Sequence, residues 1–173
     1  MNKNKALATR IRAVSHLSGT FTLRSGKTAS EYFDKYKFEA NPDILSEITK
    51  MMVDLIPPGT EVLAGLELGG IPIGTMLSHY SGIPAAFVRK EAKAYGTARL
   101  AEGAEVSGKN VLIVEDVVTS GGQIILSAND LRLLGAHIDY ALCVIDREEG
   151  GSEKLDSNQI KLISLFKKSD LVE

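Results

Sequence analysis

Residues 111–123 constrain the fold of this chain more than any other segment; they read Val-Leu-Ile-Val-Glu-Asp-Val-Val-Thr-Ser-Gly-Gly-Gln. A short apolar run, typical of a buried strand, ends in the adjacent carboxylates Glu115 and Asp116. A Gly-Gly turn then leads into a helix-like segment at residues 123–134. The backbone N–H groups of such a turn and the positive end of the helix favour an anion. Because the carboxylates would repel a bare phosphate, they suit a hydroxyl-bearing part of the same ligand, and the segment predicts a sugar-phosphate site.

This segment resembles the 5-phosphoribosyl-1-pyrophosphate (PRPP) motif of the type I phosphoribosyltransferases. In that motif an apolar strand, an acidic pair and two apolar residues precede Thr-Ser-Gly-Gly. The acidic pair of the family holds the ribose hydroxyls, and the turn holds the 5′-phosphate. The resemblance implies that the PRPP site includes Glu115, Asp116, Val117, Val118, Thr119, Ser120, Gly121, Gly122 and Gln123.

Two other nucleotide signatures and one structural alternative compete with this interpretation. Gly26-Lys27-Thr28 imitates the end of a P-loop, but Phe21 occupies the position at which that motif needs its first glycine. Without a P-loop, Asp116 has little support as the magnesium-holding aspartate of an NTPase. The remaining alternative is an ordinary strand–turn–helix corner, which would leave two adjacent carboxylates without a ligand at a cost in free energy.

Strand-like and helix-like patterns alternate along the rest of the chain. Apolar runs predict strands at residues 61–67, 85–89, 110–115, 138–146 and 160–166, with short strands or extended pieces at 20–24 and 31–38. Helical periodicity predicts helices at 5–17, 71–80 and 122–134, and one that begins at Asn41-Pro42 and carries its apolar stripe to Leu55. Several strands are apolar without alternation, which is typical of strands covered on both faces. The pattern predicts an α/β fold with a mostly parallel sheet flanked by helices.

The length fits a single phosphoribosyltransferase domain over residues 1–173. Its expected parts are a small N-terminal hood of about residues 1–40, a core of about residues 41–173 and a flexible catalytic loop. Residues 90–109 show no apolar period, as expected of a long working loop. The loops at 67–70, 89–103 and 115–123 each follow a predicted strand, so we expect them to converge on one crevice.

Composition argues against several classes of function. The formal net charge of −2 does not suit a general nucleic-acid binder, and no run of 18 or more apolar residues is present to cross a membrane. His16, His79 and His137 lie far apart without ligand spacing, so a zinc site has little support. Cys143 is the single cysteine and is expected in the core. The lone cysteine, and the lack of an apolar segment behind the basic N-terminus, predict a cytoplasmic protein.

Further motifs resemble the orotate phosphoribosyltransferases within the family. They are residues 21–27 with the following Tyr32-Phe33, the loop residues 89–97, and Asp-Arg-Glu-Glu-Gly at 146–150, in the expected order. The resemblance implies transfer of ribose 5-phosphate from PRPP to orotate, giving orotidine 5′-monophosphate and pyrophosphate in pyrimidine (UMP) biosynthesis. A flat pyrimidine bearing a carboxylate suits guanidinium forks and aromatic rings. The implied orotate-binding residues are Arg24, Tyr32, Phe33, Thr119 and Arg147.

The implied reaction develops positive charge on the sugar and negative charge on the leaving group, so it needs anions near the ribose and cations near the pyrophosphate. The resemblance assigns the catalytic roles to Lys93, Lys90, Arg89 and Asp116. Arg89, Lys90 and Lys93 would form a mobile clamp that also excludes water.

Three more residues, Tyr95, Leu68 and Gly69, complete the implied PRPP site, the last two through their backbone. Mg²⁺ would be carried on PRPP and pyrophosphate, so no metal-binding residue is expected. The family also implies a homodimer in which the catalytic loop is shared across subunits. PRPP and orotate are thus the expected partners, with no nucleic acid and no membrane.

Two positions depart from the well-known bacterial branch of the family. Tyr95 stands where that branch has histidine, and Gly69 stands where it has lysine. The reference pKa of tyrosine is about 10, so Tyr95 is a poor acid at neutral pH and the proton donor to pyrophosphate stays open. Pyrophosphate binding at Gly69 must rest on the backbone.

Three alternatives remain open. A phosphoribosyltransferase for a purine or uracil would keep the phosphate turn but leave Arg24, Arg147 and Lys93 without a purpose. A PRPP-sensing regulator usually carries a DNA-binding helical pair or a basic face, whereas a single N-terminal helix is predicted here. A salvage subunit that depends on a decarboxylase partner is the third, and no decarboxylase segment fits in this length.

Overall fold

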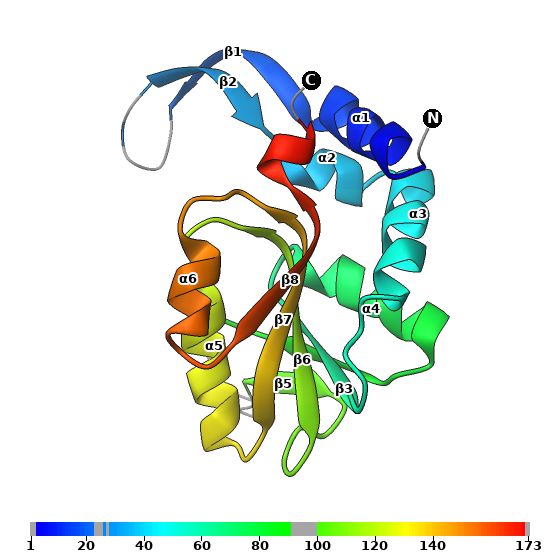
Figure 1. Ribbon diagram of the computed structural model, residues 1–173, viewed down its shortest axis with the longest axis vertical. Helices are drawn as coiled ribbons and strands as arrows, with labels where there is room; N and C mark the ends of the chain where they lie inside the picture. Colours follow the sequence, from blue (N-terminus) through cyan, green and yellow to red (C-terminus); the bar gives the residue numbers. More distant parts are fainter. Residues whose placement is uncertain (1–2, 23–25, 27, 91–99, 172–173) are drawn as a thin grey trace.

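The computed structural model describes residues 3–22, 26, 28–90 and 100–171, and a six-stranded sheet lies at its centre (Figure 1). The strand order is β5-β4-β3-β6-β7-β8. The strands are β3 (Val62–Leu66), β4 (Ala85–Val88), β5 (Ala101–Gly103), β6 (Asn110–Val118), β7 (His137–Asp146) and β8 (Lys161–Lys167). Neighbours from β4 to β8 pair in parallel, and β5 pairs antiparallel with β4. The predicted mostly parallel α/β sheet is confirmed.

Helices cover both faces of this sheet. Figure 1 shows α5 (Gly122–Leu133) and α6 (Gly151–Asp156) on one side and α3 (Pro42–Val53) and α4 (Gly70–Ser81) on the other. Along β6, Val111 and Ile113 belong to the core that includes α5, whereas Leu112 and Val114 belong to the core that includes α3 and α4. Both faces of the strand are buried, which explains why its sequence is apolar without alternation.

A second, two-stranded sheet lies at one end of the molecule. Its strands, β1 (His16–Thr22) and β2 (Thr28–Phe33), pair antiparallel, and Figure 1 shows them beyond the end of the main sheet where β8 leads into the short helix η1 (Lys168–Leu171). The short helix α2 (Lys35–Glu39) follows β2 and packs against α1 (Lys3–Ser15) and α3. Phe38 of α2 is fully buried in the core, so this helix is fixed to the main body.

The N-terminal boundaries differ from the prediction. The first helix ends at Ser15 rather than residue 17, because His16 already pairs with Phe33 across the small sheet. The expected extended piece at 31–38 is wrong in its second half, which forms α2. Asp34 begins that helix by accepting a hydrogen bond from Tyr36 N at 3.2 Å.

Other boundaries confirm or extend the prediction. The side chain of Asn41 accepts a hydrogen bond from Ile44 N (3.1 Å) and caps α3 as expected. The predicted strand at 110–115 continues to Val118, because pairing with β7 persists through Val117 and Val118. The elements β5, α6 and η1 were not predicted, since such short segments show too little periodicity. Within the described residues, no helix has the length and apolar character needed to span a bilayer.

Candidate active site

Two adjacent carboxylates lie near the carboxyl end of β6, in the middle of the main sheet. Asp116 is fully buried, and Glu115 is 9% exposed. Asp116 Oδ1 accepts a hydrogen bond from Val117 N (2.6 Å), and Glu115 Oε1 accepts one from Asp116 N (3.1 Å). Two carboxyl groups this far from water need further compensating partners.

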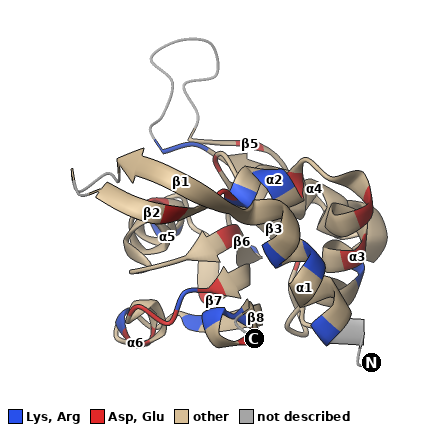
Figure 2. Cartoon of the chain, turned by 90° about the horizontal axis from the view of Figure 1, so that it is seen from above, with Lys and Arg blue, Asp and Glu red and all other residues tan. Residues whose placement is uncertain are grey.

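Helix α2 supplies those partners, and the sequence analysis missed both. Lys35 Nζ lies 2.7 Å from Asp116 Oδ2, with about a third of the lysine side chain exposed. Glu39 comes four residues later, on the same face of the helix, and its nearly buried carboxyl group lies beside Asp116: both carboxyl groups border the position that a Cβ of Gly69 would take. Figure 2 shows the basic segments of α2 close to the acidic segment of β6. The i, i+4 spacing was the available signal, but it was hidden by the prediction of an extended segment at 31–38.

Burial and charge set the protonation of this cluster. Burial, followed by the hydrogen bond to Asp116 and its negative charge, raises the pKa of Glu39 to about 9. Burial also raises the pKa of Glu115 well above its usual range, and Asp116 adds to the effect. For Asp116 burial acts upward, but hydrogen bonds from Glu39, Glu115 and Lys35 outweigh it and lower the pKa. Near neutral pH, Lys35 and Asp116 are therefore the charged pair, whereas burial favours the protonated form of Glu39 and of Glu115.

Glu39→Gln is expected to remove part of the pH dependence of stability. The pKa of Glu39 rises from an ordinary 4.5 to about 9 on folding, so the folded chain holds a proton that the unfolded chain loses between these values. This stabilisation is complete below pH 4.5 and is lost as the pH rises through about 9. The slope is at most about 1.4 kcal/mol per pH unit. The Tm of the variant, relative to the wild type, should therefore rise from about pH 5 to about pH 9; a constant difference would contradict the assignment.

The turn between β3 and α4 presses against the same carboxylates. The peptide bond between Glu67 and Leu68 is cis, and Leu68 is exposed. A Cβ atom at Gly69 would lie 1.7 Å from Asp116 Oδ2, and one at Gly70 would lie 2.3 Å from Val114 O. A side chain at Gly70 would therefore meet the backbone of β6, and a side chain at Gly69 would displace the Asp116 carboxylate from the position it has here.

The start of the predicted catalytic loop lies beside this turn. Lys90 N donates a hydrogen bond to Glu67 Oε1 (2.6 Å), and the Lys90 side chain is exposed. Arg89 is half-buried at the end of β4. The structure therefore brings Arg89 and Lys90 to the same end of the sheet as the acidic pair. The predicted site residues Arg24, Lys93 and Tyr95 lie outside the described residues.

The phosphate turn follows β6 as expected. Thr119 and Ser120 are exposed, Gly121 has a φ of 68°, and no side chain of the described residues caps α5 at its start. Uncapped N–H groups at the start of a helix are available to an anion. A Cβ at Gly121 would also lie only 3.0 Å from Leu155, so α6 packs closely against the turn.

The side chains of the other residues in the predicted turn are less available to contact a ligand. Val118 is 2% exposed and packs in the core, while Val117 is half-buried. Gln123 donates a hydrogen bond from Nε2 to Ser127 Oγ (3.2 Å) within α5. These three residues can therefore serve a phosphate or sugar mainly through their backbone.

A cavity of about 500 Å³ lies between the small sheet and the end of β7. Three predicted orotate-binding residues line it, namely Tyr32, Phe33 and Arg147. Structure alone adds the cationic or titratable side chains Arg12, His16 and Lys168. Among the lining residues Glu31 carries the acidic group, and it lies 3.3 Å from His16 Nε2. The cavity is thus rich in cations and bounded by aromatic rings, which suits a flat anion.

Arg147 connects this cavity to β6. Its backbone N donates a hydrogen bond to Val118 O (2.9 Å), and its Nη2 lies 3.2 Å from Glu149 Oε1. The Nε atom is buried and has no hydrogen-bond partner among the described residues. The guanidinium therefore retains an unused donor beside the cavity.

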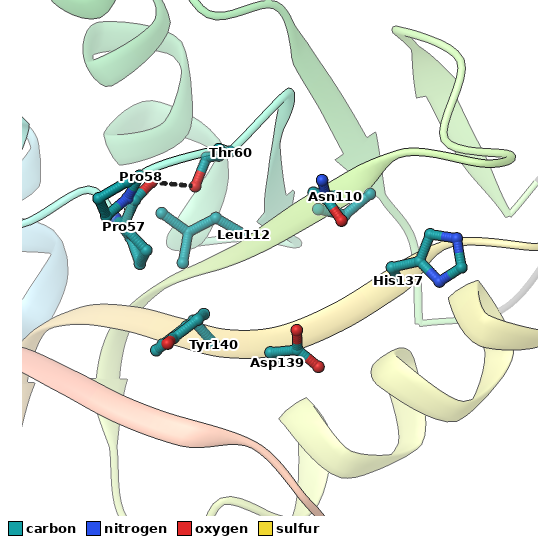
Figure 3. A pocket seen from close by; sticks show the side chains of 10 residues that line it. Pro57, Pro58, Thr60, Asn110, Leu112, His137, Asp139 and Tyr140 are labelled. Carbon is teal, nitrogen blue, oxygen red and sulfur yellow. Dashed lines mark hydrogen bonds between the residues drawn. The ribbon is translucent and has the colours of Figure 1, made fainter.

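A second cavity lies at the opposite end of the sheet. It measures about 180 Å³ and is shown in Figure 3, where Asn110, His137 and Asp139 come from the beginnings of β6 and β7. The acidic pair lies at the other end of β6, so this cavity takes no part in the candidate site.

The chain is similar to proteins of one family. The family model described as the phosphoribosyl transferase domain matches residues 34–167. With a parallel sheet, an acidic pair and a glycine turn ahead of a helix, the chain is a member of the phosphoribosyltransferase family.

Individual relatives define the branch more closely. The orotate phosphoribosyltransferase of Nocardioides sp. is 47% identical over 171 residues, covering 99% of this chain and 96% of the relative. The crystal structure of Mycobacterium tuberculosis orotate phosphoribosyltransferase with Fe(III) dicitrate is 32% identical, with a TM-score of 0.89 and coverage of 98% and 99%. The complex of the M. tuberculosis enzyme with PRPP is 29% identical, with a TM-score of 0.83 and coverage of 97% and 98%. Within the family, this chain belongs to the orotate phosphoribosyltransferases.

Proposed function

We propose that this protein transfers the ribose 5-phosphate group of PRPP to orotate, giving orotidine 5′-monophosphate and pyrophosphate in pyrimidine (UMP) biosynthesis. One observation carries the proposal: an acidic pair, an uncapped helix start and a cation-rich cavity gather at the same end of the sheet. Each matches one chemical group of the substrates, namely the ribose hydroxyls, the 5′-phosphate and the flat orotate anion. The relatives named above support the same assignment.

The roles of individual residues follow from charge and position. Asp116 is proposed as the anion that stabilises the positive charge developing on the ribose, and Glu115 completes the acidic pair beside it. Arg89 and Lys90 are proposed to stabilise the negative charge of the leaving pyrophosphate, because they follow β4 at the same end of the sheet as the acidic pair. Lys93 belongs to the same basic segment and is proposed to join them when the loop closes.

Magnesium is proposed to enter with PRPP, on its pyrophosphate and ribose oxygens. Mg²⁺ usually keeps several waters and binds through substrate phosphates, so substrate oxygens and water would supply its ligands. We further propose a homodimer in which the basic loop of one subunit serves the site of the other, in the cytoplasm, where a single buried cysteine stays reduced.

The direct test is a spectrophotometric assay of orotate consumption with PRPP and magnesium. Orotate-only, magnesium-dependent turnover is expected, with uracil, adenine and guanine as controls. Turnover with a different base would mean that the cavity binds that base and not orotate. PRPP binding without turnover of any base would indicate a PRPP sensor, and a DNA mobility shift that weakens with salt would then support regulation.

Arg147→Leu is expected to raise the KM for orotate while leaving the KM for PRPP nearly unchanged. A charge-assisted hydrogen bond is worth about 1.5–3 kcal/mol, which corresponds to roughly a tenfold to hundredfold loss of affinity. Steady-state kinetics with each substrate varied in turn would measure this. Arg10→Leu is the matched control, because Arg10 is an exposed residue of α1 that pairs with Glu47 on the surface. An equal rise in both KM values would contradict a role in base recognition.

A further inference from the structure

Asp116, which the proposed function places against the ribose, is closed off in this structure. Its side chain has no exposure, since Lys35 Nζ lies 2.7 Å from Oδ2, the Glu39 carboxyl group lies beside it and Gly69 packs against it. A ribose hydroxyl therefore reaches Asp116 only after one of these neighbours moves.

The three neighbours differ in how readily they can move. At Gly69 the group that packs against Asp116 is the backbone itself. Glu39 is 7% exposed and lies on a helix that the buried Phe38 anchors. Lys35 has about a third of its side chain in solvent and a flexible four-carbon stem, so its ammonium can leave Asp116 without any change in the helix. Lys35 is thus the neighbour of Asp116 that a ligand can displace.

The charge balance points to where Lys35 goes. In the closed arrangement the Lys35 ammonium neutralises the buried Asp116 carboxylate at 2.7 Å. When a neutral hydroxyl takes the place of the ammonium, Lys35 needs a new anion within the reach of its stem. The pyrophosphate of PRPP is the anion that arrives attached to that ribose.

We propose that Lys35 is a further substrate-binding residue of this enzyme: it covers Asp116 in the empty site and moves to a pyrophosphate oxygen of PRPP when a ribose hydroxyl replaces it. Glu39 stays beside Asp116 as a positioning residue that holds this carboxylate in place. Both assignments rest on the proposed function, because they take Asp116 to be the ribose-binding carboxylate.

Kinetics of Lys35→Met, Lys35→Arg and Lys37→Met test the role of Lys35, after turnover of the wild type with orotate has been shown. Lys37 is the matched control, being an exposed lysine of the same helix. Lys35→Met should raise the KM for PRPP about tenfold or more and leave the KM for orotate within about twofold, and Lys35→Arg should restore most of the PRPP affinity. Calorimetry with PRPP in the absence of orotate should show the same order of affinities.

The outcomes separate this inference from the proposed function. If the wild type does not turn over orotate, the proposed function itself is wrong. An active wild type whose Lys35→Met variant binds PRPP as tightly as before, or more tightly, overturns the role of Lys35. The comparison of Glu39→Gln with Glu39→Leu tests the second residue, because glutamine keeps a donor: kcat of the leucine variant should be at least about tenfold lower, and equal kcat values would overturn the positioning role.

Discussion

Asp116→Asn is expected to lower kcat by about a hundredfold or more while the fold is retained. Asparagine has nearly the same shape, but it removes the buried negative charge that would stabilise the positively charged sugar. Loss of a single preorganised electrostatic partner typically costs about 10²–10³ in kcat. The loss should fall on kcat more than on the KM for PRPP, because the charge acts mainly in the transition state.

Steady-state assays of Asp116→Asn, together with its Tm, measure this effect. Asp139→Asn is the matched control, since Asp139 is exposed at the amino end of β7, far from the acidic pair. Turnover of Asp116→Asn close to that of the wild type would remove Asp116 from the chemistry. A large fall in Tm with a proportional loss of active protein would instead make its role structural.

Gly69→Ala is the second substitution expected to have a large effect. The added Cβ would lie 1.7 Å from Asp116 Oδ2 and 3.0 Å from Glu39 Oε1, so the buried carboxylate has to move. Overpacking of this kind costs about 1–3 kcal/mol, or roughly 2–10 °C in Tm for a domain of this size. Because the displaced group is the anion at the ribose, activity should fall by about a hundredfold as well.

Thermal unfolding and the orotate assay check both parts of this prediction. Thr75→Ala is the control, because Thr75 is exposed on the same helix, α4. Wild-type activity in Gly69→Ala would mean that Asp116 can move without consequence. The same geometry gives a physical reason for glycine at this position, where the well-known bacterial branch has lysine: a side chain here would meet Asp116 directly.

The sheet and the phosphate turn were accessible from the sequence because their signals are local. Strands buried on both faces must be apolar throughout, which made β3, β6 and β7 recognisable, and the Thr-Ser-Gly-Gly turn is read from adjacent residues. Short elements such as α2 and α6 were missed, since five or six residues show little periodicity. Their positions depend on tertiary contacts, such as the burial of Phe38 and Leu155.

By itself, the sequence determined the α/β class, the acidic pair and the glycine turn, because strand burial and phosphate binding by backbone each require particular residues within a few positions. The tertiary structure decided which groups surround that pair. Lys35 and Glu39 lie more than 75 residues from Asp116 along the chain, and only the docking of α2 above β6 brings them into contact. The charge of a buried carboxylate depends on every neighbour within a few ångströms, whatever their separation in sequence, so its protonation and its accessibility are properties of the folded chain.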